Sequence, residues 1–518
     1  MQFVVLAYFL PFSIALALSA LHYAHMFQLE SYLPRQFLRW MLNRTQFRRI
    51  VVFIPAFLSA FLMLFWPEKL LPVILSAFLM LFPIRTFFPY KAKKPLVYTA
   101  RVKRMLATYT VVCILISVLC VHFGYVGLTA LLLPLSGFML LLANLINYPF
   151  EQAVRGYFIN DAKKILKARK GTLVVIGITG SYGKTSTKFF LTELLSQKYN
   201  VLMTPASFNT TMGVVRVIRE MLKPSHEIFV CEMGARTVGE IKEICDIVMP
   251  TYGIITSIGP QHLETFHSIE NIVKTKFELA DAVGENDHMV LNADNRYIYD
   301  RRYCDKYTYY GMTNTDAAYF GEDLVATSDG TSFNLRFPDG DVIALSARLL
   351  GQHNAMNIIA SVAIADKFEI PRKDIVRAVR MLNPVPHRLQ LVDGGDVTII
   401  DDSFNSNPIG SRSALEALAV FDGVRVLVTP GMVELGESQS FLNYEFGVLA
   451  GKICQYIYVV GEVNYESIYN GVFSTGFDVD KRLIRVKSPE DAIFRVRSLR
   501  TDYPKIILLE NDLPDNFR

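Results

Sequence analysis

Long apolar segments follow one another through the first 150 residues, and they restrict the possible folds of this chain more than any other feature. A helix needs about 20 apolar residues to cross the hydrocarbon core of a bilayer. Five segments reach or approach that length: roughly 3–24, 50–66, 70–89, 105–123 and 127–147. The second and third are short and lie close together, so they form either a hairpin or one re-entrant pair. The pattern predicts an α-helical membrane domain over 1–150 with about five transmembrane helices.

The charges are distributed unevenly between this region and the rest of the chain. Residues 1–150 hold 13 of the 53 Lys and Arg residues but only 2 of the 48 Asp and Glu residues. The net charge of +5 therefore averages a basic apolar third and an acidic remainder, and it does not indicate a nucleic-acid-binding surface. The six cysteines include no C-x-x-C pair, which argues against a zinc site or a disulfide framework.

The basic residues also predict the orientation of the helices. They concentrate in the connections 34–49 and 85–104 and in the segment 151–170, which we interpret as a juxtamembrane linker. Short loops rich in Lys and Arg stay in the cytoplasm, so residues 151–518 are expected there, on a plasma membrane. Topogenic charge explains these residues well, and a site for lipid headgroups or a polyprenyl phosphate is the alternative. No ionisable residue lies deep within a run except His122, which is near an end, so the helices are expected to anchor the chain or to hold a lipid substrate, and no ion pathway is indicated.

After residue 171 the pattern changes to short β-branched runs that alternate with amphipathic stretches. This alternation predicts βαβ units and parallel sheets. We place one α/β domain over 171–382, with an antiparallel insert within 297–350 and a closing helix at 354–367. Asn383-Pro384-Val385-Pro386 is interpreted as a linker to a second, Rossmann-like α/β domain over 383–518.

A candidate phosphate-binding loop follows the predicted strand 173–178. Its sequence is Thr-Gly-Ser-Tyr-Gly-Lys-Thr-Ser-Thr over 179–187, and a helix is predicted directly after it. Gly180 and Gly183 would let the backbone approach a ligand, Lys184 would reach the β- and γ-phosphates, and the Thr185 hydroxyl would bind Mg²⁺. The spacing is G-x-x-G-K-T, which is shorter than the usual P-loop, so the strand–loop–helix context carries the prediction of a nucleotide site.

Two further polar residues follow predicted strands. Glu232 comes directly after 228–231, and His262 comes shortly after 254–259. Ligands of open α/β sheets bind at the carboxyl ends of the strands, where a carboxylate and an imidazole can hold a metal. Either residue alone is more often a helix cap or an ordinary polar contact, but their shared position favours a site.

Taken together, these motifs resemble the Mur ligases, ATP-dependent amide-forming enzymes of bacterial cell-wall synthesis. The resemblance covers about 171–500, with the motifs in the family's order. They are ITGSYGKTST, EMGA, ITSIGPQHLETF, KTKFELA, NADN, GQHNAMN, PHRLQ, and DDSFNSNP followed by GMVELGE. The last of them are most similar to the members that add D-alanyl-D-alanine to a UDP-linked muramoyl tripeptide.

The resemblance implies roles for individual residues. Glu232 and His262 would hold Mg²⁺ with Thr185, and Lys276 would be carbamylated and hold a second Mg²⁺; Lys274 is the alternative for that lysine. Asn209 would lie near substrate and phosphate, and His353 would be structural. The residues expected around ATP are Gly180, Ser181, Gly183, Lys184, Thr185, Ser186, Asn354, Asn357, Arg388 and Asp402.

The implied reaction activates a carboxylate as an acyl phosphate, which an amine then attacks. Membrane segments replace the family's UDP-sugar-binding domain, and a Lys-Gly-Ser element is missing near the C-terminus. The carboxylate is therefore expected on a cell-wall precursor or a lipid-linked substrate, and the amine on an amino acid or dipeptide. The alternatives are a polymer synthase of the poly-γ-glutamate type and a catalytically silent scaffold for cell-wall enzymes. A transporter energised by the loop is disfavoured because the helices lack charged residues.

Overall fold

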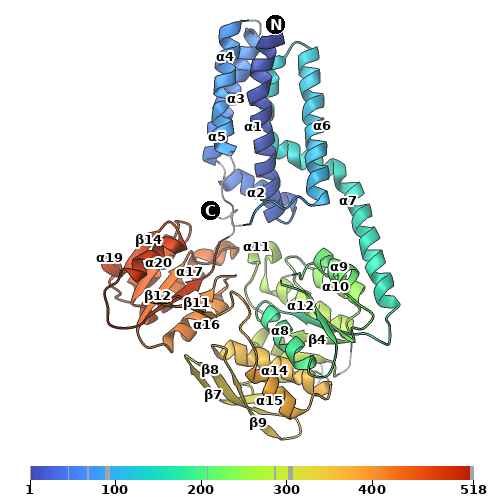
Figure 1. Cartoon of the computed structure of the whole chain (residues 1–518), viewed down its shortest axis with the longest axis vertical. Helices are drawn as coiled ribbons and strands as arrows, with labels where there is room; N and C mark the ends of the chain where they lie inside the picture. Colours follow the sequence, from blue (N-terminus) through green and yellow to red (C-terminus); the bar gives the residue numbers. More distant parts are fainter. Residues whose placement is uncertain are drawn as a thin grey trace. The chain divides into compact units, whose positions relative to one another are not determined.

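The computed structural model describes residues 2–44, 46–66, 69–87, 94–206, 208–284, 287–301, 307–404 and 406–513. The chain divides into two compact units, Phe158–Asp512 and a helical unit formed by Met1–Tyr157 with the last residues of the chain (Figure 1). The predicted turn at Pro67 and part of the basic loop, Lys91 and Lys93, lie outside the described residues.

The first unit is built from helices. They are α1 (Gln2–Leu29), α2 (Pro34–Arg44), α3 (Gln46–Phe65), α4 (Leu70–Leu79), α5 (Leu81–Phe87), α6 (Ala100–His122), the 3₁₀ helix η1 (Val126–Leu132) and α7 (Ser136–Lys167). Within the described residues, three stretches are long and apolar enough to cross a membrane: Tyr8–Leu29, Leu70–Phe87 and Ala100–His122. The bent pair η1 and α7 would make a fourth, whereas the apolar part of α3, Val52–Phe65, is shorter. The structure thus contains apolar helices where hydropathy predicted them, but the number of five crossings stays a prediction.

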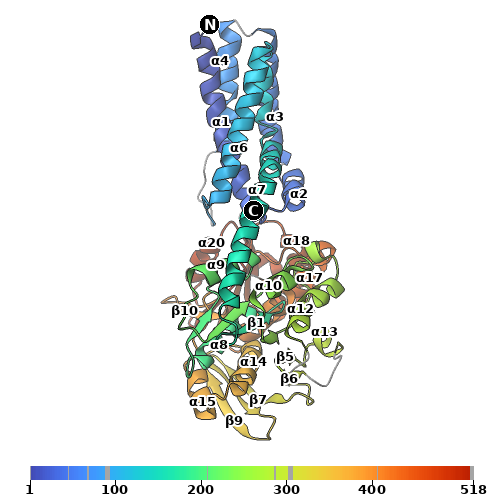
Figure 2. The same ribbon diagram turned by 90° about the vertical axis from the view of Figure 1, so that its right-hand side faces the viewer.

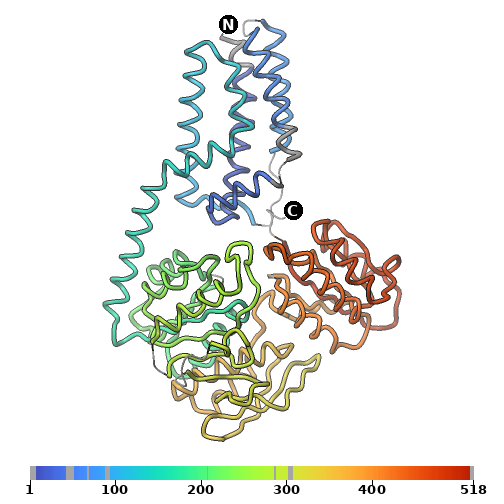
Figure 3. Tube along the Cα trace, turned by 180° about the vertical axis from the view of Figure 1, so that it is seen from behind, coloured from blue at the N-terminus to red at the C-terminus, as the bar shows by residue number. Residues whose placement is uncertain are grey.

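Helix α7 differs from the expected linker. It continues without interruption through Pro149 and the basic segment as far as Lys167, and the trace in Figure 3 follows it out of the helical unit. Its last turns belong to the second unit, where Ala162 and Leu166 are buried against helices and strands of the first sheet. Most of the segment 151–170 is therefore helical, and its end is part of a hydrophobic core.

The second unit contains two sheets. The first has nine strands in the order β2-β3-β1-β4-β5-β6-β7-β8-β9. Their bounds are β1 Val174–Thr179, β2 Val201–Met203, β3 Ile228–Glu232, β4 Tyr252–Ile255, β5 Met289–Asn292, β6 Thr308–Gly311, β7 Tyr319–Thr327, β8 Gly330–Arg336 and β9 Val342–Ala347. The strands from β2 to β7 are parallel, and β8 and β9 are antiparallel. The predicted insert is thus antiparallel only in β7–β9, while β6 extends the parallel sheet.

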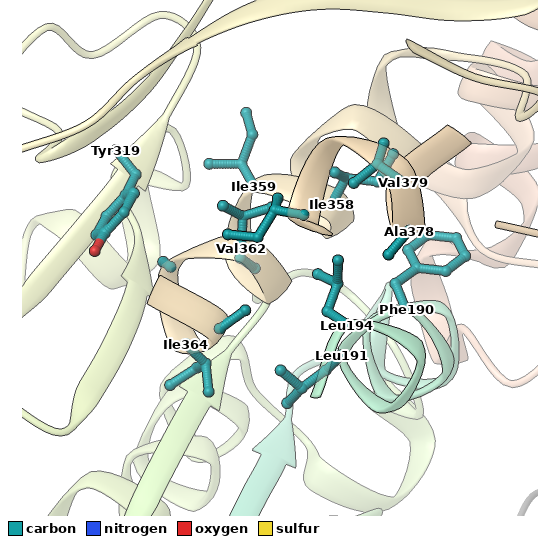
Figure 4. Close-up of a cluster of buried hydrophobic side chains, with 14 of the residues drawn as sticks. Phe190, Leu191, Leu194, Tyr319, Ile358, Ile359, Val362, Ile364, Ala378 and Val379 are labelled. Atoms are coloured by element: carbon teal, nitrogen blue, oxygen red, sulfur yellow. The ribbon is translucent and has the colours of Figure 1, made fainter. Parts of the chain in front are cut away.

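Helices cover both faces of this sheet. They are α8 (Lys184–Leu195), α9 (Thr211–Glu220), α10 (Glu240–Val248), α11 (Leu263–Phe266), α12 (Ile269–Val283), α13 (Arg296–Tyr299), α14 (Gln352–Lys367) and α15 (Arg372–Arg380). Helices α8, α14 and α15 lie together on one side (Figure 2), where Leu191 and Leu194 pack next to Ile358 and Val362 (Figure 4). Helices α9, α10 and α12 contribute to a separate core on the other face. The predicted closing helix is confirmed as α14.

The second sheet has six strands in the order β10-β11-β15-β12-β13-β14, all parallel except β10. The strands are β10 Gln390–Asp393, β11 Thr398–Asp402, β12 Val424–Thr429, β13 Tyr456–Val460, β14 Leu483–Val486 and β15 Lys505–Glu510. The helices are α16 Pro408–Ala419, η2 Gly436–Ser438, α17 Gln439–Ile453, α18 Tyr465–Phe473, α19 Val479–Arg482 and α20 Pro489–Arg497. The predicted second α/β fold is confirmed, whereas the domain boundaries predicted from the sequence remain predictions.

Candidate nucleotide and metal site

The loop between β1 and α8 has the conformation that a phosphate cradle requires. Gly183 lies in the left-handed region (φ 79°), and a Cβ placed there would come within 2.4 Å of the Asn357 Oδ1 atom. The Lys184 ammonium donates to the carbonyl oxygens of Gly180 at 2.8 Å and Ser181 at 3.2 Å, so the lysine folds back over the loop. Burial lowers the pKa of Lys184 to about 8. The loop thus holds a partly buried ammonium at the amino end of a helix, where anions bind.

The segment after β4 holds one face of this loop through hydrogen bonds. Ser181 donates from its backbone N–H to the Ser257 carbonyl at 2.6 Å, and its hydroxyl bonds to both the N–H and the carbonyl of Gly259 at 3.1 Å. The Tyr182 hydroxyl donates to the Pro260 carbonyl at 2.9 Å. These bonds leave the other face of the loop for a ligand. Ser186, also predicted in the ATP site, lies buried in the first turn of α8.

Glu232, at the carboxyl end of β3, is the centre of the site. Its Oε1 atom accepts from the Thr185 hydroxyl at 3.1 Å and from the Asn209 amide at 3.0 Å. Its Oε2 atom lies 3.0 Å from the Lys188 ammonium, in an ion pair whose two side chains are almost fully buried. Burial raises the pKa of the Glu232 carboxyl, but the charges of Lys188 and Lys184 outweigh it and hold the pKa below its ordinary value. The structure therefore brings together Thr185, Asn209 and Glu232, three of the candidate site residues selected from the sequence.

Lys188 is the residue that the sequence analysis missed. It lies one helical turn after Lys184, and its ammonium also donates to the Ala206 carbonyl at 2.6 Å. A lysine in the middle of an amphipathic helix ordinarily points to solvent. Its position directly after the G-K-T-S-T run, on the face that carries Lys184, was the available signal.

His262 contacts the second sheet instead of Glu232. Its Nδ1 atom lies 2.5 Å from a carboxylate oxygen of Glu434, which follows β12 and has a left-handed backbone conformation (φ 64°). Arg236 adds a longer contact to the same carboxylate at 3.8 Å. Although burial opposes ionisation, His262 and Arg236 lower the pKa of Glu434 to about 2. Glu434 is thus an ionised link between the first sheet's loops and the second sheet, and it leaves Nε2 of His262 available to a metal.

Lys276 and Lys274 have different environments on α12. Lys276 is 2% exposed, whereas Lys274 is exposed to solvent. Burial, together with the charge of Lys184, lowers the pKa of Lys276 to about 7. An amine with this pKa is largely neutral near pH 7.5, and only the neutral form can react with CO₂. The burial distinguishes Lys276 from Lys274 as the candidate for the predicted carbamylation.

Three further residues predicted around ATP, Asn354, Asn357 and Asp402, form hydrogen bonds within the protein. Asn357, on α14, accepts from the Thr187 hydroxyl at 3.2 Å behind the phosphate loop, and Asn354 donates to the Leu350 carbonyl at 2.9 Å. Asp402, at the end of β11, accepts from the Leu389 backbone N–H at 3.2 Å, and burial raises its pKa to about 6.

Arg388 and His353 lie close enough for the charge of Arg388 to act on the imidazole. The Arg388 guanidinium packs 4.4 Å from the centre of the Phe404 ring, close enough to Asp402 and Glu232 to interact with both charges. The Nδ1 atom of His353 is buried without a hydrogen-bond partner among the described residues, and burial lowers its pKa to about 4. His353 is therefore neutral, in agreement with a structural role.

These residues fit a magnesium ion better than a transition metal. The described residues contain no group of three or more His, Cys, Asp or Glu side chains that could hold a metal alone. Mg²⁺ is typically bound through one or two protein oxygen ligands together with phosphate oxygens and water. The Thr185 hydroxyl and the Glu232 carboxylate, 3.1 Å apart, supply that kind of partial ligand set next to the phosphate loop.

Comparison with known proteins agrees with this arrangement. Residues 178–365 match the Mur ligase middle domain. The UDP-N-acetylmuramoyl-tripeptide–D-alanyl-D-alanine ligases of Bacillus subtilis and Escherichia coli are 30% and 31% identical over 279 and 285 residues. Each alignment covers 53% of this chain, and 60% and 62% of those relatives respectively. The chain thus spans less than two thirds of their length.

Solved structures show the same fold. MurF from Acinetobacter baumannii superposes with a TM-score of 0.62 at 24% identity, covering 68% of this chain and 77% of that one. MurF from Thermotoga maritima in complex with ADP gives 0.61 at 25% identity, covering 69% and 80%. The resemblance indicated by the motifs is confirmed: the chain contains a Mur ligase middle domain, and its central and C-terminal parts are homologous to UDP-N-acetylmuramoyl-tripeptide–D-alanyl-D-alanine ligases.

Proposed function

We propose that this chain is an ATP- and Mg²⁺-dependent carbon–nitrogen ligase of bacterial cell-wall synthesis, anchored in the plasma membrane with its catalytic part in the cytoplasm. The observation that carries the proposal is the meeting of Thr185 and Lys184 with Glu232 at the carboxyl ends of β1 and β3. A loop with an ammonium, a hydroxyl and a neighbouring carboxylate supplies what Mg²⁺-nucleotide chemistry requires.

The proposed reaction has two steps. The substrate carboxylate attacks the γ-phosphorus of ATP, and the bond between the γ-phosphorus and the bridging β-phosphate oxygen breaks. ADP departs, and the substrate becomes an acyl phosphate. The amine then attacks the acyl carbon, and inorganic phosphate leaves with the C–O electron pair after the amine loses a proton. Lys184 neutralises charge on the transferred phosphoryl group, and Asn209 holds the Glu232 carboxylate in place. Mg²⁺, when bound through Thr185, Glu232 and His262, would supply further charge neutralisation.

Lys276 is proposed to carry a carbamate. Its neutral amine would attack CO₂, form an N–C bond and release a proton, which turns a buried neutral amine into an anion that can hold a second Mg²⁺. Replacement of Lys276 by Ala should abolish ligase activity, and added bicarbonate should no longer stimulate turnover. Lys274→Ala, two positions away on the exposed face, is the matched control and should retain both. Equal loss in the two variants would reject Lys276 as the modified residue.

The second sheet is proposed to complete the ATP site. Arg388 and Asp402 follow the linker 383–386, and the positive charge of Arg388 interacts with both Asp402 and Glu232. Asn354 and Asn357 would flank the adenine. The link between His262 and Glu434 supports an arrangement in which closure of the second sheet and metal binding depend on each other.

Membrane anchoring is supported by the surface of α6. Its apolar side chains are more than half exposed at Val111, Ile114, Leu115, Val118 and Leu119. A patch of this kind is costly in water and favourable in lipid. The basic residues at the start of α6 and in the preceding loop favour a cytoplasmic location for that end and for residues 151–518.

The substrates follow from the relatives and from the anchor. The relatives' names specify a UDP-linked muramoyl tripeptide and D-alanyl-D-alanine. For this chain we propose a cell-wall precursor with a free carboxylate, lipid-linked because the enzyme is held at the membrane, and an amino acid or dipeptide as the amine.

Release of ADP and phosphate by the full chain in detergent, with Mg²⁺ and bicarbonate, tests the proposal. UDP-linked and lipid-linked muramoyl peptides are each combined with D-alanyl-D-alanine or single amino acids. Turnover should require one carboxylate and one amine together, should be lost in Lys184→Ala, and should persist in Lys198→Ala, which changes an exposed lysine beyond α8. ATP binding without turnover on any pair would contradict the ligase and favour the scaffold.

A further inference from the structure

A polar cluster occupies the helical unit where the end of α1, the first turns of α6 and the middle of α7 meet. Side chains of α6 and α7 are hydrogen-bonded across this region. The pairs are Arg101–Asn144 at 3.3 Å, Arg104–Glu151 at 2.7 and 2.9 Å, and Thr108–Asn147 at 2.9 Å. In a unit made mainly of apolar helices, such a cluster is costly unless it has a function.

Arg101 is the unusual member of the cluster. Its guanidinium stacks 4.0 Å from the centre of the Tyr32 ring, and one Nη atom donates to the Asn144 amide oxygen. Its Nε atom is buried and has no hydrogen-bond partner among the described residues. By contrast, Glu151 binds both Nε and Nη2 of Arg104 and neutralises it. The described residues therefore leave the charge of Arg101 without a carboxylate in contact.

A second donor lacks a partner in the same cluster. The amide nitrogen of Asn147 is buried and unbonded among the described residues, while its oxygen accepts from the Thr108 hydroxyl. Asn147 lies one helical turn from Asn144, the partner of Arg101. Two unsatisfied donors next to an uncompensated positive charge call for a ligand that only accepts hydrogen bonds and carries negative charge.

The position of the cluster along α6 identifies the source of that ligand. Arg101 lies in the first turn of a helix whose later turns expose apolar side chains, and α6 stands at the side of the helical unit (Figure 1). If α6 spans the bilayer, as the proposed function requires, its first turn lies at the depth of the lipid phosphates. The amino end of the helix adds a partial positive charge there.

We propose that Arg101, Asn144 and Asn147, which we name the α6 arginine site, bind the phosphate of an anionic membrane lipid. The Arg101 guanidinium and the Asn147 amide donate to phosphate oxygens, and the neutralised pair Arg104–Glu151 closes the site on one side. A guanidinium can donate to two phosphate oxygens at once, which suits a lipid phosphate with free oxygens. A headgroup with its own ammonium is disfavoured because the Arg101 guanidinium has no carboxylate in contact among the described residues. This inference rests on the proposed membrane anchoring but not on the ligase activity.

The test measures lipid binding by the purified full chain in dodecylmaltoside, with native mass spectrometry as the readout. The probes are dioctanoyl phosphatidic acid, dioctanoyl phosphatidylcholine and inorganic pyrophosphate. Arg101→Gln removes the charge and keeps a long side chain against Tyr32. Lys103→Gln removes the same charge from an exposed position in the same turn of α6 and is the matched control.

The wild-type chain should prefer phosphatidic acid to phosphatidylcholine, and Arg101→Gln should weaken phosphatidic acid binding about tenfold, the size of one charge-assisted hydrogen bond. Lys103→Gln should bind almost normally, and Arg101→Lys should bind with intermediate strength. Equal losses in Arg101→Gln and Lys103→Gln would show diffuse surface attraction and overturn the site. Displacement of phosphatidic acid by an equal concentration of pyrophosphate would overturn the lipid assignment in favour of a soluble phosphate.

Two controls separate this proposal from the proposed function. Unchanged binding of a fluorescent ATP analogue shows that the Arg101 variants are folded. A wild-type chain that stays in the membrane fraction without any preference for phosphatidic acid would reject the α6 arginine site alone, whereas a chain released from membranes without detergent would reject the anchoring itself.

Discussion

The buried pair Lys188–Glu232 dominates the energetics of the site at the scale of single residues. Replacement of Lys188 by Met should leave the Glu232 carboxylate without its cation and should destabilise the protein by about 3 kcal/mol or more. Chemical denaturation of the full chain in detergent measures this loss. The double variant Lys188→Met with Glu232→Gln should recover part of the stability, because it leaves no unpaired charge. A double variant less stable than Lys188→Met would contradict the pairing.

Glu510 predicts a pH dependence. It is buried at the end of β15, with hydrogen bonds from the Ser406 and Thr429 hydroxyls, and burial raises the pKa of its carboxyl from 4.5 to about 7. A raised carboxyl pKa destabilises the folded state progressively as pH rises from 4.5 to 7, by about 3 kcal/mol in total. Glu510→Gln should therefore raise the melting temperature more at pH 8 than at pH 5. The control Glu437→Gln, at an exposed position, should change the melting temperature at neither pH. If Glu510→Gln raised the melting temperature equally at both pH values, the raised pKa of Glu510 would be refuted.

At the scale of elements, the loop between β1 and α8 depends on its contact with α14. Gly183→Ala would place a Cβ against Asn357 in a left-handed conformation that costs about 1–2 kcal/mol for an L-residue. ATP affinity should fall at least about tenfold, measured by equilibrium binding of a fluorescent analogue. Gly171→Ala is the matched control, because Gly171 has a similar φ of 87° but no atom within 4 Å of the added Cβ. Equal affinities for the two variants would show that the Asn357 contact is unimportant.

The elements themselves were largely predictable, since the period of the apolar residues follows the local backbone. Strands β1 and β3 lie where the β-branched runs predicted them, whereas β4 overlaps the predicted strand 254–259 only in its last residues. The helical continuation of α7 was missed because hydropathy identifies lipid contact and not helix length, and its polar turns resemble a linker. The contact between His262 and Glu434 joins residues 172 positions apart, so local pattern cannot reveal it. Lys188 was missed because a buried lysine needs a partner that only the folded sheet supplies.

At the scale of the whole molecule, the last turns of α7 set where the second unit begins. Residues 158–512, produced alone, should stay soluble and bind ATP, because they contain the cores around both sheets. A piece that starts at residue 171 loses Ala162 and Leu166 and should be less stable by about 2 kcal/mol or more. Thermal unfolding of the two pieces measures the difference. Equal stabilities would place the boundary at the segment after α7, as the sequence alone predicted.

The second prediction at this scale concerns the link between the two sheets. Glu434→Gln should weaken the contact with His262 and Arg236 and raise the ATP concentration needed for half-maximal turnover, while Glu437→Gln, three residues further along, should not. Reduced protection of the loop 259–267 from hydrogen exchange should accompany the kinetic change. Unaltered exchange in Glu434→Gln would show that closure does not depend on this carboxylate.

The pair Lys188–Glu232 also bears on the order in which the ligands arrive. The Lys188 ammonium is part of the same chain, so its effective concentration near Glu232 exceeds the concentration of free magnesium in a cell. Magnesium therefore displaces the ammonium only when its binding is coupled to a further favourable interaction. A nucleotide that brings its own metal offers that gain, since its phosphates bind the loop while the cation approaches Glu232. The resting protein is therefore expected to ignore fluctuations in free magnesium and to respond to the supply of the magnesium–nucleotide complex.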